Sequence, residues 1–273
     1  MSALALALAL AAAFVHAFWN LLIAGARDTQ AATAVALAVG ALVFAPVAAA
    51  TWRVERGAVP FLVASAALEL VYVALLAAAY SRSELSLVYP LSRGLAPVIV
   101  LVVAVVALGA ATSALQLAGV LVVVAGVLAV RGPRGRADRR GVVFALAIAG
   151  TIAAYTLVDN SGVEHAAALS YFELALGPTA VIYFVAMFAR RGGQALAAEV
   201  SLRTIVAGVA MFGAYGLVLL ALQHAPAAPV SAVRESSVVI ATILAARVLH
   251  ERVTALRLAG ATLVVAGVAL LAI

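Results

Sequence analysis

The sequence contains no cysteine and no lysine, and it has few charged residues of any kind. Without cysteine, disulfide bonds and thiol chemistry are excluded. Only 10% of the 273 residues are charged and 67% are hydrophobic, whereas a soluble domain is about a quarter charged and about half apolar. No water-soluble core of this size takes up so large an apolar excess, so the composition excludes an ordinary soluble protein.

Apolar runs of about 20 residues, the length that a helix needs to cross the hydrocarbon core of a bilayer, recur along the whole chain. We therefore predict an all-α integral membrane protein with ten transmembrane helices. The predicted spans are residues 3–24, 31–51, 59–80, 86–107, 113–130, 141–160, 168–189, 203–222, 228–247 and 255–272.

The two halves of the chain resemble each other. The stretch LQLAGVLVVVAGVLAV begins at Leu115, and LRLAGATLVVAGVALL begins 141 positions later, at Leu256. The same offset places Arg93 on Arg234, both inside predicted spans. Five spans per half is an odd number, so the second half enters the membrane in the opposite sense, as in many secondary transporters. We predict two inverted five-helix repeats, residues 1–132 and 141–273, joined by a basic linker at 133–140.

The arginines indicate how the chain is oriented. If the amino terminus is outside, thirteen arginines lie in the cytoplasmic connections, and only Arg53 and Arg56 lie on the other side. By the positive-inside rule, this bias predicts both termini outside, and we expect the bacterial inner membrane. The same rule accounts for the net charge of +6 without a nucleic-acid partner.

Ionisable side chains within the spans are the first candidates for function. A charged side chain at the bilayer centre costs about 2.5–3.5 kcal/mol on insertion scales, so it faces protein or water. With inverted halves, Arg93 and Arg234 are expected on opposite sides of the midplane, bracketing a central cavity. Alternatively, each arginine ties helices together through carbonyl groups or through a carboxylate such as Glu69. Glu69 itself is expected either in an ion pair or as a neutral carboxyl group.

Other polar residues repeat at helical spacing and share a face. His16, Trp19 and Asn20 lie at i, i+3 and i+4, and Tyr155 and Asp159 are one turn apart. Packing roles remain an alternative, above all for His16. The cavity residues that we predict are Arg93, Arg234, His16, Trp19, Asn20, Glu69, Tyr72, Tyr89, Tyr155 and Asp159.

Several stretches resemble the EamA-type transporters of the drug/metabolite transporter superfamily. They are HAFWN (16–20), VYPLSRGLAPVIV (88–100), AAYTLVDNSGV (153–163) and the segment from Ser231 to the end of the chain. The resemblance covers essentially the whole chain as two EamA units. It implies ten helices in an inverted repeat and the transport of small metabolites, often amino acids or other organic solutes.

We therefore expect a secondary transporter that works by alternating access, functions as a monomer in lipid and needs no cofactor or metal. The sequence has no nucleotide-binding loop, so a gradient of protons, another ion or the solute itself supplies the driving force. The alternatives are a lipid-linked flippase of the same architecture and, less favoured, an intramembrane enzyme. Neither G-x-S-x-G nor H-E-x-x-H occurs, so we predict no catalytic residue.

The topology prediction can be tested because the chain has no cysteine of its own. Cysteines introduced one at a time as Ser2→Cys and Ala272→Cys should both react with a membrane-impermeant maleimide added outside intact cells. Labelling of the two ends from different faces of the membrane would rule out the inverted arrangement.

Overall fold

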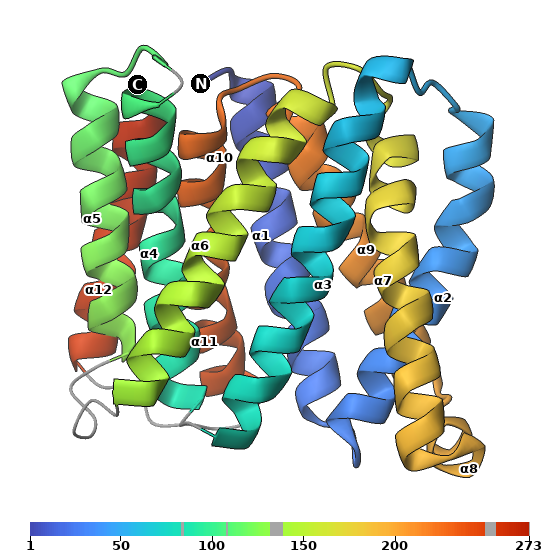
Figure 1. Cartoon of the computed structure of the whole chain (residues 1–273). Coiled ribbons are helices and arrows are strands. Elements are labelled where there is room, and N and C mark those ends of the chain that lie inside the picture. Colours follow the sequence, from blue (N-terminus) through green and yellow to red (C-terminus); the bar gives the residue numbers. More distant parts are fainter. Residues whose placement is uncertain (83–84, 108, 132–138, 249–254, 273) are drawn as a thin grey trace.

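The computed structural model describes residues 1–82, 85–107, 109–131, 139–248 and 255–272, which form a bundle of α-helices (Figure 1). The first half contains α1 (Ala3–Ala24), α2 (Thr29–Ala50), the 3₁₀ turn η1 (Arg56–Ala58), α3 (Val59–Arg82), α4 (Leu85–Val106) and α5 (Ala114–Arg131). The second half contains α6 (Arg139–Gly162), α7 (Ala168–Arg191), α8 (Gly193–Ala198), α9 (Leu202–Leu222), α10 (Ala227–Arg234), α11 (Ser237–Val248) and α12 (Ala255–Ala272). Six positions of the expected linker 133–140, residues 133–138, lie outside the described residues, and α6 already begins at Arg139.

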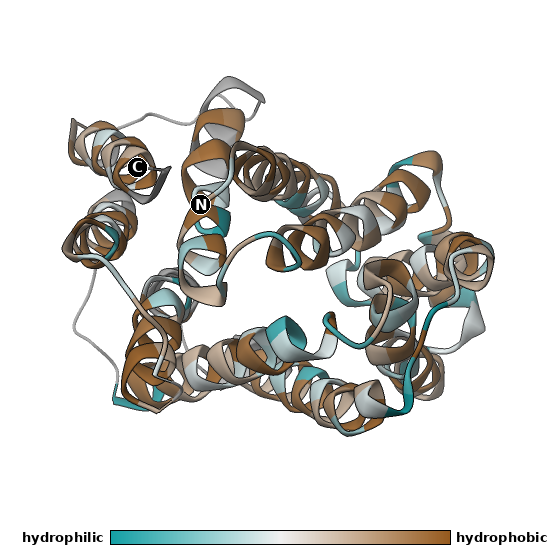
Figure 2. Ribbon diagram, turned by 90° about the horizontal axis from the view of Figure 1, so that it is seen from above, coloured by the Kyte–Doolittle hydropathy of each residue, from teal (hydrophilic) through white to brown (hydrophobic). Residues whose placement is uncertain are grey.

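Six helices are long and apolar enough to cross a membrane, and three apolar stretches are shorter. Large apolar side chains point outward from them, with Leu42 75% and Val63 66% exposed. Figure 2 shows hydrophobic residues around the circumference of the bundle. An apolar surface of this extent is stable against the hydrocarbon chains of lipids but not against water. The all-helical membrane class is thus confirmed, and the count of ten spans stays a prediction.

The predicted ninth span, 228–247, is not one uninterrupted helix. It divides into α10 and α11, and the backbone changes there to shorter-range hydrogen bonds. Ser236 N donates to Val233 O at 3.0 Å, and Val238 N donates to Glu235 O at 3.1 Å, both spanning three residues. Tightened turns of this kind inside helices often mark functional hinges. The sequence RESS places a charged pair and two serines at the interruption, and hydropathy alone did not reveal it.

Both chain ends lie at the same end of the bundle (Figure 1). At that end, the connection before α3 pairs with the connection between α6 and α7: Glu55 N donates to His165 O at 2.9 Å, and Ala167 N donates to Arg53 O at 2.7 Å. At the other end, the α1–α2 connection is tied to the segment before α9, where Asp28 N donates to the Glu199 carboxylate at 2.9 Å. These connections hold the two halves of the chain together.

Helices α5 and α12 lie side by side at one edge of the bundle (Figure 1). A Cβ atom added at Gly126 would lie 2.7 Å from Gly260 O, and one added at Gly267 would lie 2.8 Å from Gly119 O. The two contacts interchange at the offset of 141 residues. Glycine therefore permits backbone contact between these helices, as is common in membranes.

Gly126→Ala should destabilise the protein because the new methyl group overlaps backbone atoms of α12 and must push the two helices apart. We expect a loss of about 1–3 kcal/mol, read as a lower midpoint of thermal unfolding in detergent. Gly150→Ala on α6 is the matched control, since no atom lies within 4 Å of its added Cβ. Equal midpoints for the two variants would contradict the close α5–α12 contact.

Candidate functional site

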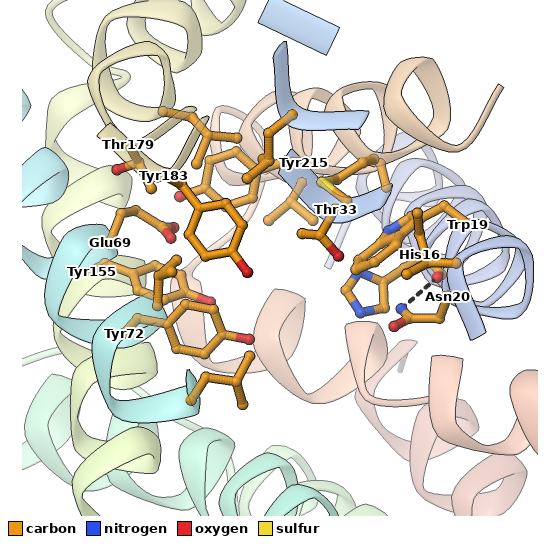
Figure 3. Close-up of a pocket in the computed structure, with 18 of the residues that line it drawn as sticks. His16, Trp19, Asn20, Thr33, Glu69, Tyr72, Tyr155, Thr179, Tyr183 and Tyr215 are labelled. Atoms are coloured by element: carbon orange, nitrogen blue, oxygen red, sulfur yellow. Dashed lines mark hydrogen bonds between the residues drawn. The ribbon is translucent and has the colours of Figure 1, made fainter. Parts of the chain in front are cut away.

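A cavity of about 650 Å³ lies among α1, α2, α3, α4, α6, α7, α9 and α10 (Figure 3). It reaches the surface at the end of the bundle that carries the α1–α2 connection, where the exposed Thr29 is part of its wall. Towards the end with the two termini, its wall consists of buried apolar residues such as Ala12, Leu37 and Val218. Of the described residues in the cavity wall, only Thr29 is exposed, so the cavity is open at the end that carries the α1–α2 connection.

Most of the predicted cavity residues come together here. The wall includes Arg93, Arg234, His16, Trp19, Asn20, Glu69, Tyr72 and Tyr155. Asp159 does not line the cavity, and the side chain of Tyr89 lies outside the described residues.

The two arginines share one carboxylate. Arg93 Nη1 and Arg234 Nη2 each lie 3.7 Å from Glu235 Oε1, and all three side chains are buried. Arg93 also donates to Tyr72 Oη at 3.5 Å. The guanidinium groups thus meet at one point and do not bracket the cavity from opposite sides, which corrects the expectation from inverted halves. The reason is that Glu235, at the α10–α11 interruption, reaches both of them.

Glu69 is not the carboxylate that pairs with the arginines. Among the described residues, no ion pair within 4.0 Å joins it to Arg93 or Arg234. Instead it lies on a wall of tyrosines: the rings of Tyr72 and Tyr155 are 6.1 Å apart, and those of Tyr155 and Tyr215 are 6.3 Å apart. In Figure 3 the hydroxyl groups of Tyr72, Tyr155 and Tyr183 point into the cavity.

Helix α1 forms the opposite wall with His16, Trp19 and Asn20 (Figure 3). Asn20 Nδ2 donates to the His16 carbonyl at 2.8 Å, and the His16 and Trp19 rings meet edge to face at 5.0 Å. Within the described part of the chain, His16 Nε2 and Trp19 Nε1 are buried without a hydrogen-bond partner. Unsatisfied buried donors and acceptors are costly, so this wall is suited to a polar ligand.

Asp159 is a structural centre behind the tyrosine wall. Its carboxylate accepts hydrogen bonds from Ser65 Oγ at 2.6 Å, from Tyr171 Oη at 3.1 Å and from Tyr215 Oη. These donors come from α3, α7 and α9, so one buried carboxylate joins four helices. Its contribution to the cavity is indirect, through the position of Tyr215.

Sequence reasoning missed several residues of the site. The additional polar residues that line the cavity are Thr29, Gln30, Thr33, Thr179, Tyr183 and Tyr215. Tyr183 and Tyr215 stand alone in apolar spans, which is a usable signal, whereas the threonines carry none, because threonine is common in membrane helices. Glu235, the residue after Arg234, is not among the predicted cavity residues.

Comparison with known proteins agrees with this architecture. The family model for the EamA-like transporter family matches residues 139–273. The chain is an EamA-type protein. The resemblance seen in the sequence is therefore confirmed over residues 139–273, and membership points to an integral membrane transporter rather than an enzyme.

The crystal structure of another protein aligns with 99% of this EamA-type chain and 96% of its own, with a TM-score of 0.77 and 17% sequence identity. At this identity the likeness shows the fold alone. No curated protein matches the sequence.

Replacement of Asp159 should reveal its role as a centre of hydrogen bonds. Asp159→Ala leaves the buried hydroxyl groups of Ser65 and Tyr171 without their acceptor, at about 1–3 kcal/mol each, and also releases Tyr215. Asp159→Asn keeps one carbonyl oxygen and should lose less stability. Thermal unfolding in detergent measures both, and an alanine variant as stable as the asparagine variant would contradict this role.

Proposed function

We propose that the protein is a secondary active transporter that moves a small polar metabolite, such as an amino acid or an organic acid, by alternating access. The observation that carries the proposal is the one-sided cavity with Arg93 and Arg234 in its wall. Guanidinium groups bind carboxylates with directed, charge-assisted hydrogen bonds. In Arg234, Nε and Nη2 have no hydrogen-bond partner among the described residues, so donors are available for such a group.

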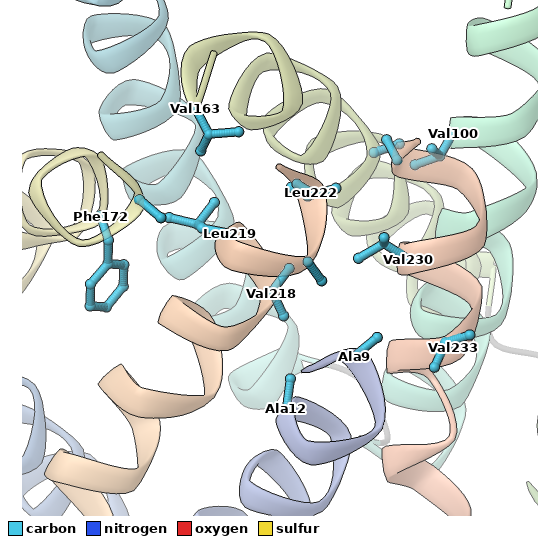
Figure 4. Packing of buried hydrophobic residues seen from close by; sticks show 14 of the residues in the cluster. Ala9, Ala12, Val100, Val163, Phe172, Val218, Leu219, Leu222, Val230 and Val233 are labelled. Carbon is cyan, nitrogen blue, oxygen red and sulfur yellow. The ribbon is translucent and has the colours of Figure 1, made fainter. Parts of the chain in front are cut away.

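The closed end of the bundle supports alternating access. Buried apolar side chains from α1, α4, α6, α7, α9 and α10 pack there between the cavity and the surface (Figure 4). Val163, Leu222 and Val230 are among them. This packing of apolar side chains is a seal, and opening it exposes apolar surface. We propose that this seal opens while the end near Thr29 closes.

The repeat supports the same mechanism. The glycine contacts between α5 and α12 interchange at the offset of 141, as they would across an internal two-fold axis. The hydrogen bonds between connections follow the same symmetry. The α1–α2 connection is bonded to the segment before α9, and the α6–α7 connection, which occupies the equivalent place in its half, is bonded to the segment before α3. We propose that these are two inverted five-helix repeats, residues 1–132 and 141–273, with ten spans in all. Inverted repeats provide two states of similar energy that face opposite sides.

We further propose that both termini lie outside a bacterial inner membrane. The arginines of the α1–α2 and α7–α9 connections, including Arg27, Arg191 and Arg203, lie at the end where the cavity opens. With that end in the cytoplasm, the structure represents the inward-facing state. The driving force is a gradient of protons, another ion or the solute.

The cavity has two chemically different walls, which favours an amino acid or a similar solute. The arginines suit a carboxylate, and Glu69 with the surrounding tyrosine hydroxyls suits an ammonium or hydroxyl group. A solute with both kinds of group would contact both walls.

Flux measurements test the proposal. A thermal-stability screen of the purified protein against amino acids, organic acids, phosphonates and amines first identifies a ligand, because a ligand of the folded form stabilises it. Uptake of that ligand into vesicles should then fall at least about tenfold in Arg93→Ala and in Arg234→Ala, because each loses a buried charged contact. Arg56→Ala, at the exposed far end, should transport normally.

Unchanged flux in both arginine variants would refute the proposed site. If Arg234→Ala does not fold, Arg234→Lys replaces it in the flux measurement, because lysine keeps the positive charge but loses the bidentate geometry of the guanidinium group. Transfer of a lipid-linked probe between leaflets, without uptake of any soluble compound, would favour the flippase alternative.

A further inference from the structure

The arginine pair and its carboxylate do not balance in charge. Arg93 and Arg234 bring two positive charges to one carboxylate, that of Glu235. Both arginines line the cavity, whereas Glu235 lies behind them, fully buried. With Glu235 ionised, the group carries one net positive charge next to the cavity.

The repeat shows why Glu235 has no acidic counterpart next to Arg93 in the first half. At the offset of 141, the counterpart of Glu235 in the first half is Gly94, the residue after Arg93. A Cβ at Gly94 would lie 3.6 Å from Leu128 Cδ2 and 3.7 Å from Val127 Cγ1 of α5. That space accepts a methyl group, but a carboxylate there would be buried against apolar side chains. At these equivalent positions, the two halves therefore provide two arginines and a single acid, Glu235.

The ion pairs of Arg93 and Arg234 with Glu235 are long. At 3.7 Å they are longer than hydrogen bonds, and both carboxylate oxygens of Glu235 lack a hydrogen-bond partner among the described residues, as do Nε and Nη2 of Arg234. Buried charges are stable only when they are paired and hydrogen-bonded. One further anionic group in the cavity would supply the missing acceptor and bring the net charge of the group to zero.

We propose that Glu235 determines specificity by making the arginine pair a site for a single negative charge, so that monoanionic or zwitterionic solutes bind and dianionic solutes are rejected. The inference rests on the proposed function and narrows its substrate class. A second negative charge on the solute would lie near Glu235 or face Glu69 on the tyrosine wall. Like charges placed together in a buried site cost several kcal/mol.

Two probes of nearly equal size test the proposal: succinamate, which carries one negative charge at pH 7.5, and succinate, which carries two. Binding to the purified full-length protein in detergent is measured by thermal stabilisation and calorimetry. The wild type should bind succinamate at least about tenfold more tightly than succinate. Glu235→Gln should remove this preference by strengthening succinate binding at least about tenfold, and Gly94→Ala, the matched control, should keep it.

The outcomes separate the inference from the proposed function. Arginine-dependent binding with an unchanged preference in Glu235→Gln overturns the role of Glu235 and leaves the transport site standing. If Glu235→Gln does not fold, the wild type still decides, because succinate bound as tightly as succinamate contradicts the inference. Failure of both probes to bind the wild type also contradicts it, whereas the flux test of the arginine variants is unaffected.

Discussion

The arrangement of this protein depends on the cost of placing ionised side chains inside a hydrocarbon layer. A guanidinium group at that depth must face protein or water and find a counter-charge. Arg93 and Arg234 satisfy this requirement together, through Glu235 and through a cavity that reaches the surface. The position of the cavity and the interruption between α10 and α11 are both understandable as consequences of that requirement.

The helix interruption also serves the charges directly. Arg234 is the last residue of α10, where the carbonyl end of the helix favours a cation, and Glu235 directly precedes Ser236 and the start of α11, where the amide end favours an anion. A straight helix would provide neither end at this depth. Behind the opposite wall, Asp159 holds Tyr215 in place through a neutral network of hydroxyl donors. Our proposal places the solute at the arginine pair, where Arg93 and Arg234 share the single carboxylate of Glu235.

The sequence predicted the helices well because their length and hydropathy are imposed by the bilayer. Eight of the predicted residues lie in the cavity wall, among them Arg93, Arg234 and Glu69, whose charged groups would be costly facing lipid. The sequence did not predict the features that depend on contacts between helices. The pairing of both arginines with Glu235 depends on the approach of α4 to α10, and the withdrawal of Asp159 from the cavity depends on donors from three other helices. Hydropathy carries no information about either. The positions of Tyr183 and Tyr215 in the cavity wall likewise depend on how α7 and α9 pack.

The most direct test of the account is water access to the cavity from one face of the membrane. Because the chain has no cysteine, Asn20→Cys and Thr33→Cys give single reactive sites on two cavity walls, and Val63→Cys gives an outward-facing control. A membrane-impermeant maleimide should label the first two in inside-out vesicles, be much slower in right-side-out vesicles, and fail to label Val63→Cys from either side. Labelling of the two cavity sites only from the outer face, or from neither face, would contradict a water-filled cavity open to the arginine-rich side.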